Sequence, residues 1–364
     1  MFRNHFADKT VLVTGHTGFK GSWLTAWLLR LGASVAGLSE SIPTCPSHFE
    51  SADLEKRISH HIGDVRDQGF VSSLIGETRP DFVFHLAAQP LVRRSYAEPL
   101  DTISTNVMGT VNVLEALRLS GHRCNAVVIT SDKCYDNVEQ VWGYRETDAL
   151  GGKDPYSASK GAAELVVRTY AASYFGKDSR VRVAVGRAGN VIGGGDWAED
   201  RIVPDCVRAW SKGNPVEIRR PNSTRPWQHV LEPLSGYLLL AAMLEEGQDL
   251  TGEPFNFGPP AHQNYSVARL LDEIGKHWPG ADWKNVADEA SIYEAGLLKL
   301  CCDKALHMLG WQAQLDFSET VRFTSDWYRT YYQSSSADIW DLTQRQIGEY
   351  EALAGKRGAP WAKE

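Results

Sequence analysis

Apolar and polar positions follow a regular order along the first half of the chain. TVLVT (residues 10–14) is a short apolar run, GHTGFKG follows as a glycine turn, and SWLTAWLLRLG has the spacing of an amphipathic helix. Apolar runs that alternate with helices indicate parallel strands covered on both faces, so we expect an α/β fold with a doubly wound parallel sheet. Further strands are expected at 33–38, 57–62, 81–87, 124–130 and 180–187, and helices up to about 76, at about 100–120 and from 155.

The order changes after residue 187, where GGGDW, proline-containing turns and RRPNSTRPW are typical of loops that line a site. A helix at 230–244 and a strand in FNFGP (255–259) are expected to return to the main sheet, and short helices predominate from 266. The last part, including a helix-like stretch at 339–354, has no predicted place. The expected division is a dinucleotide-binding unit (1–187 plus about 229–259), a smaller, discontinuous mixed α/β substrate unit (about 188–228 plus 260–335) and a C-terminal segment (336–364).

Composition narrows the class of protein. The formal net charge of -7 argues against a general nucleic-acid binder, whose footprint would be basic. The longest apolar run, 237–244, is too short to cross a bilayer, and MFRNHFADKT lacks the apolar core of a signal peptide. The six cysteines show no ligand spacing. We therefore expect a cytoplasmic protein with reduced thiols, no membrane or nucleic-acid partner and no metal site.

Three glycines, Gly15, Gly18 and Gly21, stand three residues apart between the first strand and the first helix. Glycines at this turn let the backbone approach a pyrophosphate, and the helix N-terminus supplies amide donors, so the turn predicts a Rossmann-type dinucleotide site. Lys20 would either neutralise a cofactor phosphate or be solvated surface. The second strand ends in Leu38-Ser39-Glu40 with no acid cleanly at its tip, which leaves NAD against NADP open from this feature. The other loop residues expected at the cofactor are His16, Thr17 and Phe19.

The ends of the third and fourth strands offer further cofactor contacts. Asp64 follows the third strand and would flank the adenine, although a simple turn aspartate is an equal alternative. HLAAQ, at the end of the fourth strand, has small residues past which a cofactor could run close to the backbone. The cofactor contacts expected outside the glycine loop are Asp64, Val65, Leu86, Ala87, Ala88, Asn106, Tyr156 and Lys160.

The segment KDPYSASKG holds Tyr156 and Lys160 four residues apart at the start of a predicted helix, and so on one helix face. An ammonium beside a phenol would lower the pKa of the phenol and make it a base for a sugar hydroxyl. An exposed tyrosine and lysine on an ordinary helix are the alternative. TSDK lies at the end of the fifth strand, the edge of the sheet where ligands bind in such folds. Its Ser131, Asp132 and Lys133 are further candidates for proton transfer beside Tyr156 and Lys160. The alternative is that they form only a capping turn.

Arginines gather in the loops after residue 187. Guanidinium groups match phosphate oxygens in bidentate geometry, so this cluster favours a substrate that carries a diphosphate, although a solvated basic face is the alternative. Trp227, beside Arg225, favours the wall of a site over open surface. The residues expected to contact substrate are Gln89, Asn190, Arg201, Arg219, Arg225 and His229.

Taken together, TGHTGFKG, HLAAQ, TNVMGT, TSDK, YSASK, RAGNVIGGGDW and RPWQHV, spread over about residues 10–230, resemble the extended short-chain dehydrogenase/reductase family and within it the nucleotide-sugar 4,6-dehydratases. GHTGFKGSW, the Asp-Lys pair and RPWQHVLEPL are most similar to the subfamily that acts on CDP-glucose. The resemblance implies a lyase that uses NAD and converts CDP-D-glucose to CDP-4-keto-6-deoxy-D-glucose. It also implies deoxysugar biosynthesis, as for the lipopolysaccharide O-antigen, and a homodimer or higher homo-oligomer paired through the helices near 100–120 and 155–175.

The resemblance further implies roles for individual residues. Tyr156, helped by Lys160 and Ser131, would take the proton of the sugar 4-hydroxyl, and Asp132 would protonate the departing 6-hydroxyl. The better-known dehydratases carry Asp-Glu where this chain has Asp132-Lys133. Our hypothesis is that Lys133 acts as a neutral amine base at C5, which requires its pKa to be lowered by burial or a neighbouring cation. By the same resemblance, Asn190, Arg201 and Arg225 would hold the diphosphate.

Other functions remain open at this point. A nucleotide-sugar 4-epimerase needs the tyrosine and the lysine but no acid aimed at C6, so TSDK speaks against it. A dehydratase of another nucleotide sugar would keep every motif. A non-catalytic dinucleotide-binding regulator would need only the glycine loop, and the intact Ser131, Tyr156 and Lys160 speak against that alternative.

Overall fold

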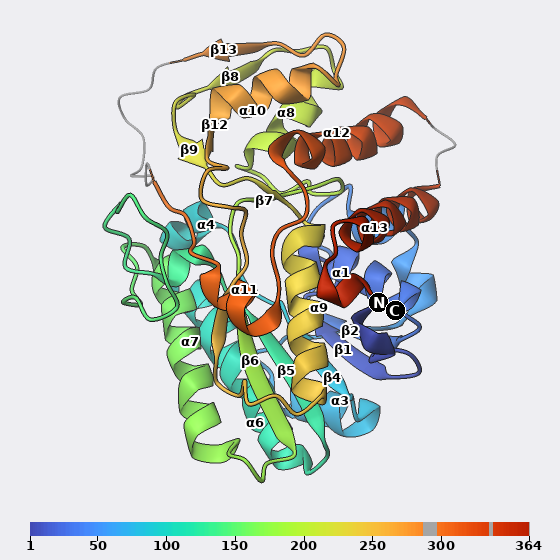
Figure 1. Cartoon of the computed structure of the whole chain (residues 1–364), viewed down its shortest axis with the longest axis vertical. Coiled ribbons are helices and arrows are strands. Elements are labelled where there is room, and N and C mark those ends of the chain that lie inside the picture. Colours follow the sequence, from blue (N-terminus) through green and yellow to red (C-terminus); the bar gives the residue numbers. More distant parts are fainter. Residues whose placement is uncertain (287–296, 335–337, 364) are drawn as a thin grey trace.

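The computed structural model, which describes residues 1–286, 297–334 and 338–363, is built on a sheet of seven parallel strands (Figure 1). The spatial order is β11-β6-β5-β4-β1-β2-β3, so the chain reverses its direction of growth between β1 and β4, the place where doubly wound sheets bind ligands. The expected fold class is confirmed. The strands are β1 (Thr10–Thr14), β2 (Ser34–Ser39), β3 (Ser59–Ile62), β4 (Phe82–His85), β5 (Cys124–Ile129), β6 (Val181–Arg187) and β11 (Pro254–Asn256).

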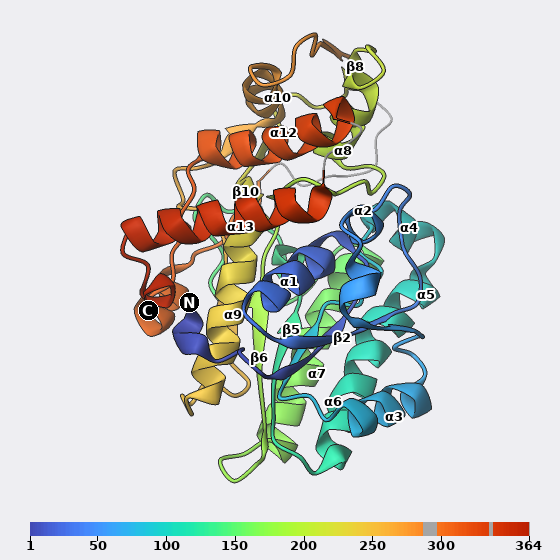
Figure 2. The same ribbon diagram turned by 90° about the vertical axis from the view of Figure 1, so that its right-hand side faces the viewer.

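Helices cover both faces of this sheet (Figure 2). One face carries α3 (Gln68–Thr78), α6 (Gly109–Ser120) and α7 (Pro155–Tyr174), and the other carries α1 (Phe19–Arg30), α9 (Leu231–Glu245) and α11 (Asp303–Leu309). The helix predicted at about 100–120 is instead α5 (Pro99–Ile103) and α6 joined by a π-helical turn at Ser104–Met108. Shorter elements are α2 (His48–Ser51), α4 (Val92–Ala97) and the 3-10 helices Phe2–Asn4, Leu54–Arg57, Asp132–Cys134 and Pro360–Ala362.

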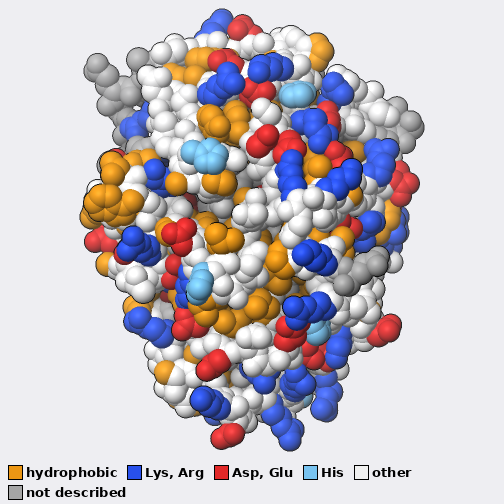
Figure 3. Space-filling model, viewed as in Figure 1, with side chains coloured by type: hydrophobic (Ala, Val, Ile, Leu, Met, Phe, Trp, Pro, Cys, Tyr) orange, Lys and Arg blue, Asp and Glu red, His pale blue; other side chains and the backbone are white. Residues whose placement is uncertain are grey.

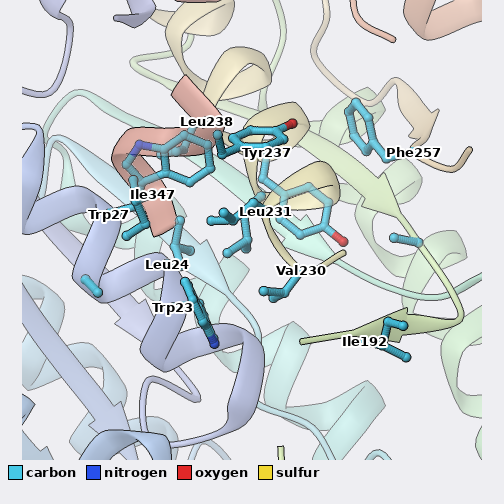
Figure 4. Close-up of a cluster of buried hydrophobic side chains, with 14 of the residues drawn as sticks. Trp23, Leu24, Trp27, Ile192, Val230, Leu231, Tyr237, Leu238, Phe257 and Ile347 are labelled. Carbon is cyan, nitrogen blue, oxygen red and sulfur yellow. The ribbon is translucent and has the colours of Figure 1, made fainter. Parts of the chain in front are cut away.

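The main core lies between α1 and α9. Trp23, Leu24 and Trp27 of α1 meet Leu231 and Leu238 of α9, and all five side chains are fully or almost fully buried (Figure 4). The same cluster includes side chains of α13 (Ile339–Lys356), which lies along α1 (Figure 2). The C-terminal segment that the sequence could not place is therefore part of the core.

A smaller group of elements lies beyond the carboxyl ends of the strands, at the top of Figure 1. It consists of α8, α10 and α12 with three two-stranded pairs, β7 with β10, β8 with β13 and β9 with β12. The predicted substrate unit includes this group and also α11, which packs on β11 and α9 beside the main sheet. The bounds are α8 (Ile202–Trp210), α10 (Val267–Gly275), α12 (Phe317–Gln333), β7 (Val191–Ile192), β8 (Val216–Ile218), β9 (Thr224–Arg225), β10 (Gln228–His229), β12 (Tyr265–Ser266) and β13 (Trp283–Asn285).

The surface in Figure 3 mixes charged side chains of both signs, and apolar side chains gather at its left side. The loop between Asp132–Cys134 and α7 lies on that side in Figure 1 and exposes Val138, Val141 and Trp142. Among the described residues, no helix has both the length and the apolar character needed to cross a membrane.

Candidate active site

A cleft of about 1560 Å³ opens along the carboxyl edge of the sheet, below the smaller group of elements. Its walls come from the glycine loop, the ends of β4 and β5, the start of α7 and the segments around α8 and β8. Pockets for one small ligand hold roughly 300–1,000 Å³, so this cleft has room for a dinucleotide and a substrate together. Nowhere in the described chain do three His, Cys, Asp or Glu side chains group as a metal site.

The glycine loop leaves no room for side chains at two of its positions. Gly15 has a φ of +76°, and a Cβ there would come within 2.7 Å of the Ala87 amide nitrogen. A Cβ on Gly21 would overlap the Gly15 carbonyl. Gly18 precedes α1, which no described side chain caps, so the first amides of the helix are available to a ligand. This cradle fits the pyrophosphate of a dinucleotide.

Two other residues of the loop point in opposite directions. The His16 side chain is fully buried behind the loop, with Nδ1 3.0 Å from the Ser39 hydroxyl and Nε2 2.6 Å from Nδ1 of His60. This side chain does not face the cleft, where a cofactor contact of His16 was expected. Lys20 is half-buried in the cleft, and burial together with the positive charge of Arg201 lowers its pKa to about 8. Thr17 and Phe19 also line the cleft.

At the far end of the cofactor side, Glu40 and Asp64 line the cleft and share one cation. Nη2 of Arg66 lies 2.6 Å from Asp64 and 3.1 Å from Glu40, and its Nη1 lies 2.5 Å from Asp101. Glu40 therefore lines the cleft one residue beyond the end of β2 and is engaged by Arg66. Val65, Leu86, Ala87 and Ala88 line the cleft beside this cluster.

Gln89 lines the cleft, but Asn106 does not. Asn106 is buried below the loop, where its Oδ1 accepts from the Gln89 amide at 2.8 Å and its Nδ2 donates to the Ser159 hydroxyl at 2.8 Å. It fixes the loop after β4 against α7, and its side chain does not face the cleft, where a cofactor contact was expected. The His229 side chain is also buried outside the cleft, with its ring against Trp23 and Phe323, although a substrate contact was expected of it.

Asp132 is held in one orientation at the end of β5. The Ser131 hydroxyl donates to its Oδ1 at 2.9 Å, and Nδ2 of Asn190 donates to its Oδ2 at 3.2 Å. Gly189 leaves space for this carboxylate, because a Cβ there would overlap it. Because both of its oxygens are held, this carboxyl group would exchange a proton with a ligand atom at one defined position in the cleft.

Tyr156 and Lys160 reach the same part of the cleft from α7. Pro155 takes the first helical position, and Asp154 caps the helix by accepting from the Ser157 amide. Burial raises the pKa of Tyr156 to about 12, opposed by its hydrogen bond with Ser131. The predicted lowering of this pKa by Lys160 is wrong, because burial of the phenol has the largest effect and the ammonium instead approaches the Ile129 carbonyl at 3.5 Å. Burial lowers the pKa of Lys160 to about 8.

An ion pair that the sequence did not predict lies directly behind these residues. Glu164, one turn beyond Lys160, accepts from Nε of Arg187 at 2.8 Å and from the Thr130 hydroxyl at 2.5 Å. Both side chains of the pair are almost completely buried, 3% and 2% exposed. The spacing Tyr156-Lys160-Glu164 was the available signal, since it places all three on one helix face.

The arginines mark the substrate side of the cleft. Arg201 lies 2.8 Å from Asp196, a nearly buried acid in GGGDW, and its charge acts on both Tyr156 and Lys20. Asn190, Arg219 and Arg225 line the cleft with it, together with Lys133, which is half-buried beside Asp132. The sequence did not predict Asp196 as a site residue, although the GGGDW motif that contains it was assigned to a loop lining the site.

Comparison with known proteins identifies relatives of this arrangement. The family model described as GDP-mannose 4,6 dehydratase matches residues 12–324. A CDP-glucose 4,6-dehydratase of Salmonella typhimurium is 46% identical over 353 residues, 96% of this chain and 98% of that protein. A dTDP-glucose 4,6-dehydratase of Streptomyces antibioticus is 30% identical, over 88% of this chain and 92% of that protein.

Solved structures agree on the fold. The UDP-glucose 4-epimerase of Thermus thermophilus, solved as a complex with NAD, superposes with a TM-score of 0.75 at 25% identity, over 88% of this chain and 99% of that one. MoeE5 in complex with UDP-glucuronic acid and NAD superposes with a TM-score of 0.74 at 26% identity, over 88% and 99%. With the family model covering most of the chain, the protein belongs to the GDP-mannose 4,6 dehydratase family.

Proposed function

We propose that this protein is an NAD-dependent lyase that converts CDP-D-glucose to CDP-4-keto-6-deoxy-D-glucose. The observation that carries the proposal is the convergence of Ser131, Asp132 and Tyr156 at one part of the cleft. A tyrosine can take the proton of the 4-hydroxyl, and a separately fixed carboxyl group can give a proton to the departing 6-hydroxyl. The 46% identity to a CDP-glucose 4,6-dehydratase supports the choice of substrate.

The reaction needs proton transfers at three positions of the sugar. Tyr156, hydrogen-bonded to Ser131, takes the proton of the 4-hydroxyl while the C4 hydrogen leaves as hydride. NAD, when bound, supplies the hydride acceptor at C4 and the hydride donor at C6. Asp132 gives its proton to the 6-hydroxyl, which departs as water, and a base takes the proton of C5. At the end, hydride reaches C6 and a proton returns to C5.

The C5 base is proposed to be Lys133, an amine half-buried beside Asp132. If Lys133 takes the C5 proton, Lys133→Met should still oxidise C4 but lose exchange of the C5 hydrogen with deuterated water. Mass spectrometry of recovered substrate and product measures that exchange. Exchange that continues at the wild-type rate assigns the step to another group.

The substrate is tested by incubating the protein with NAD and, separately, with CDP-, dTDP-, UDP- and GDP-sugars. We expect loss of one water from CDP-glucose, seen by mass and by the alkaline absorbance of a 4-keto-6-deoxy sugar. In Asp132→Asn, reduced cofactor should accumulate while water loss falls. A UDP-sugar that only changes configuration would establish an epimerase instead, and the absence of any turnover would favour a dinucleotide-binding regulator.

The assembly is proposed to be a homodimer formed through α5, α6 and α7. Large apolar side chains are exposed on these helices, including Leu100 at 84% and Leu119 at 59%, with Leu165 and Tyr174 on α7. Exposed apolar groups of this kind mark association surfaces. Light scattering should give twice the chain mass for the wild type and the single mass for Leu165→Glu; a monomeric wild type refutes the dimer.

The resemblance to the CDP-glucose subfamily also supports a cellular setting for this proposal. We infer that the enzyme works in the cytoplasm, in deoxysugar biosynthesis of the kind that feeds lipopolysaccharide O-antigen. Detection of the protein in the soluble fraction of its cells, together with its 4-keto product, tests this inference.

A further inference from the structure

The cleft runs from the glycine loop and the strand ends of the main sheet to the smaller group of elements, which lies above them in Figure 1. Tyr156 and Asp132 line it from the start of α7 and the end of β5, whereas Arg225 lines it from β9 in the smaller group. With glucose at Tyr156 and the diphosphate at the arginines, as the proposed function requires, the nucleobase falls to the smaller group. The cleft wall contributed by that group includes Glu217, Ile218, Ser223, Trp227 and Val267.

Two hydrogen bonds to backbone carbonyl groups hold this part of the cleft wall together. The Val267 amide donates to the Ser223 carbonyl at 3.0 Å, which fixes the loop after β8 against the start of α10. Nε1 of Trp227 donates to the Tyr265 carbonyl at 3.2 Å. Trp227 and Val267 therefore present fixed apolar surfaces, which suit the face of a flat base.

Glu217 lines this part of the cleft from β8. It is the middle residue of β8, whose alternation buries Val216 and Ile218 and turns Glu217 outward to the cleft. Its carboxylate makes no hydrogen bond or ion pair with any other residue in the described ranges 1–286, 297–334 and 338–363. This carboxylate is therefore available to accept a hydrogen bond from the nucleobase.

An ionised carboxylate can only accept hydrogen bonds. Cytosine presents an amino donor at C4, and a carboxylate is a suitable partner for it. Uracil and thymine carry a carbonyl oxygen at the same position, which would face the carboxylate as a second acceptor. We propose that Glu217 recognises the 4-amino group of cytosine and thereby selects CDP-sugars over UDP- and dTDP-sugars.

The test compares Glu217→Gln and Glu217→Asp with the wild type. Glutamine can donate to a carbonyl as well as accept, so we expect the preference for CDP-glucose over UDP-glucose in kcat/KM to fall by roughly 5- to 150-fold, the range expected for loss of such a pair. The change should appear mainly in KM. Aspartate keeps the acceptor and should keep the preference for CDP-glucose.

Binding supplies a second readout that does not require turnover. Calorimetric titration with CDP and with UDP should show the same loss of preference in Glu217→Gln. Asp272→Asn is the matched control, because it removes a carboxylate from α10, in the same group of elements but outside the cleft wall. Its preference should equal that of the wild type.

The outcomes separate this inference from the function on which it rests. If Glu217→Gln folds and retains the full preference for CDP, Glu217 does not read the base, while the dehydratase remains. If the wild type dehydrates a different nucleotide sugar and not CDP-glucose, the proposed substrate fails first. A preference that falls equally in Asp272→Asn would also overturn the inference.

Discussion

At the residue scale, burial sets the chemistry of Tyr156. The phenol is 8% exposed and its pKa is raised to about 12, so it gives up its proton readily only when a bound partner stabilises the phenolate. We expect Tyr156→Phe to lower turnover of CDP-glucose by about 10²- to 10⁴-fold, the usual contribution of a general base. Stopped assays for the 4-keto product measure this.

The control for this prediction is Tyr174 at the other end of α7, which lies on the proposed dimer surface and outside the cleft. Tyr174→Phe should leave turnover unchanged, and CDP should bind Tyr156→Phe as it binds the wild type. Turnover in Tyr156→Phe close to the wild-type value would show that another group takes the 4-hydroxyl proton.

The sequence could predict those site residues whose position depends on local structure. Ser131 and Asp132 follow a strand and Tyr156 begins a helix, so near neighbours in the chain decide where they point. The direction of the His229 ring depends on Trp23 and Phe323, which are distant in the chain. Only the assembled core could show that this side chain turns away from the cleft.

At the element scale, the pair Glu164–Arg187 joins α7 to β6 behind the catalytic residues. Removing one partner of a buried ion pair leaves an unpaired charge and costs about 3–5 kcal/mol. Glu164 also raises the pKa of Lys160 against the larger effect of burial. In Glu164→Gln we therefore expect a loss of unfolding free energy and an alkaline decline of activity that begins at lower pH than in the wild type.

Denaturant unfolding and a pH–rate profile measure these two effects. Glu115→Gln, which breaks the more exposed pair with Arg118, should cost at most about 1 kcal/mol and leave the profile unchanged. The double variant Glu164→Gln, Arg187→Met should recover part of the lost stability, because no buried charge is then left alone. Strictly additive losses would contradict this account of the pair.

Some helices and strands could be located from the sequence, whereas the packing partners of others could not. The central strands are short apolar runs, and their positions agree with the prediction within a few residues. The spacing of apolar residues also predicted the helix α13, but not that it packs along α1. Its partners, Trp27 and Arg30, lie more than 300 residues earlier, and the contact of Glu351 with both leaves no local signal.

At the scale of the whole molecule, Glu232 connects three distant segments in the core. Its carboxyl group accepts from the amides of Gln314 and Leu315 and from the Tyr350 hydroxyl. Burial nevertheless raises its pKa from 4.5 to about 7. Between these two values the folded protein binds more protons than the unfolded chain, so this group's contribution to stability falls as the pH rises.

We expect Glu232→Gln to remove this dependence. The difference in unfolding free energy between variant and wild type should shift in favour of the variant between about pH 4.5 and 7, by on the order of 3 kcal/mol. Chemical denaturation at several pH values measures it, with Glu115→Gln as a surface control. A difference that stays constant across this range would show that Glu232 is ionised throughout.

The two ends of the described chain lie side by side (Figure 2). They meet at the main core, where the ring of Phe2 stacks on Trp361 with centroids 5.0 Å apart. Trp361 also packs against Trp27 and Tyr350. During synthesis on the ribosome, α1 and its neighbouring strand therefore emerge well before residue 361, and the packing around Phe2 and Trp27 is completed only when Trp361 has left the exit tunnel. A nascent chain stalled before that point would leave part of these aromatic surfaces open to chaperones.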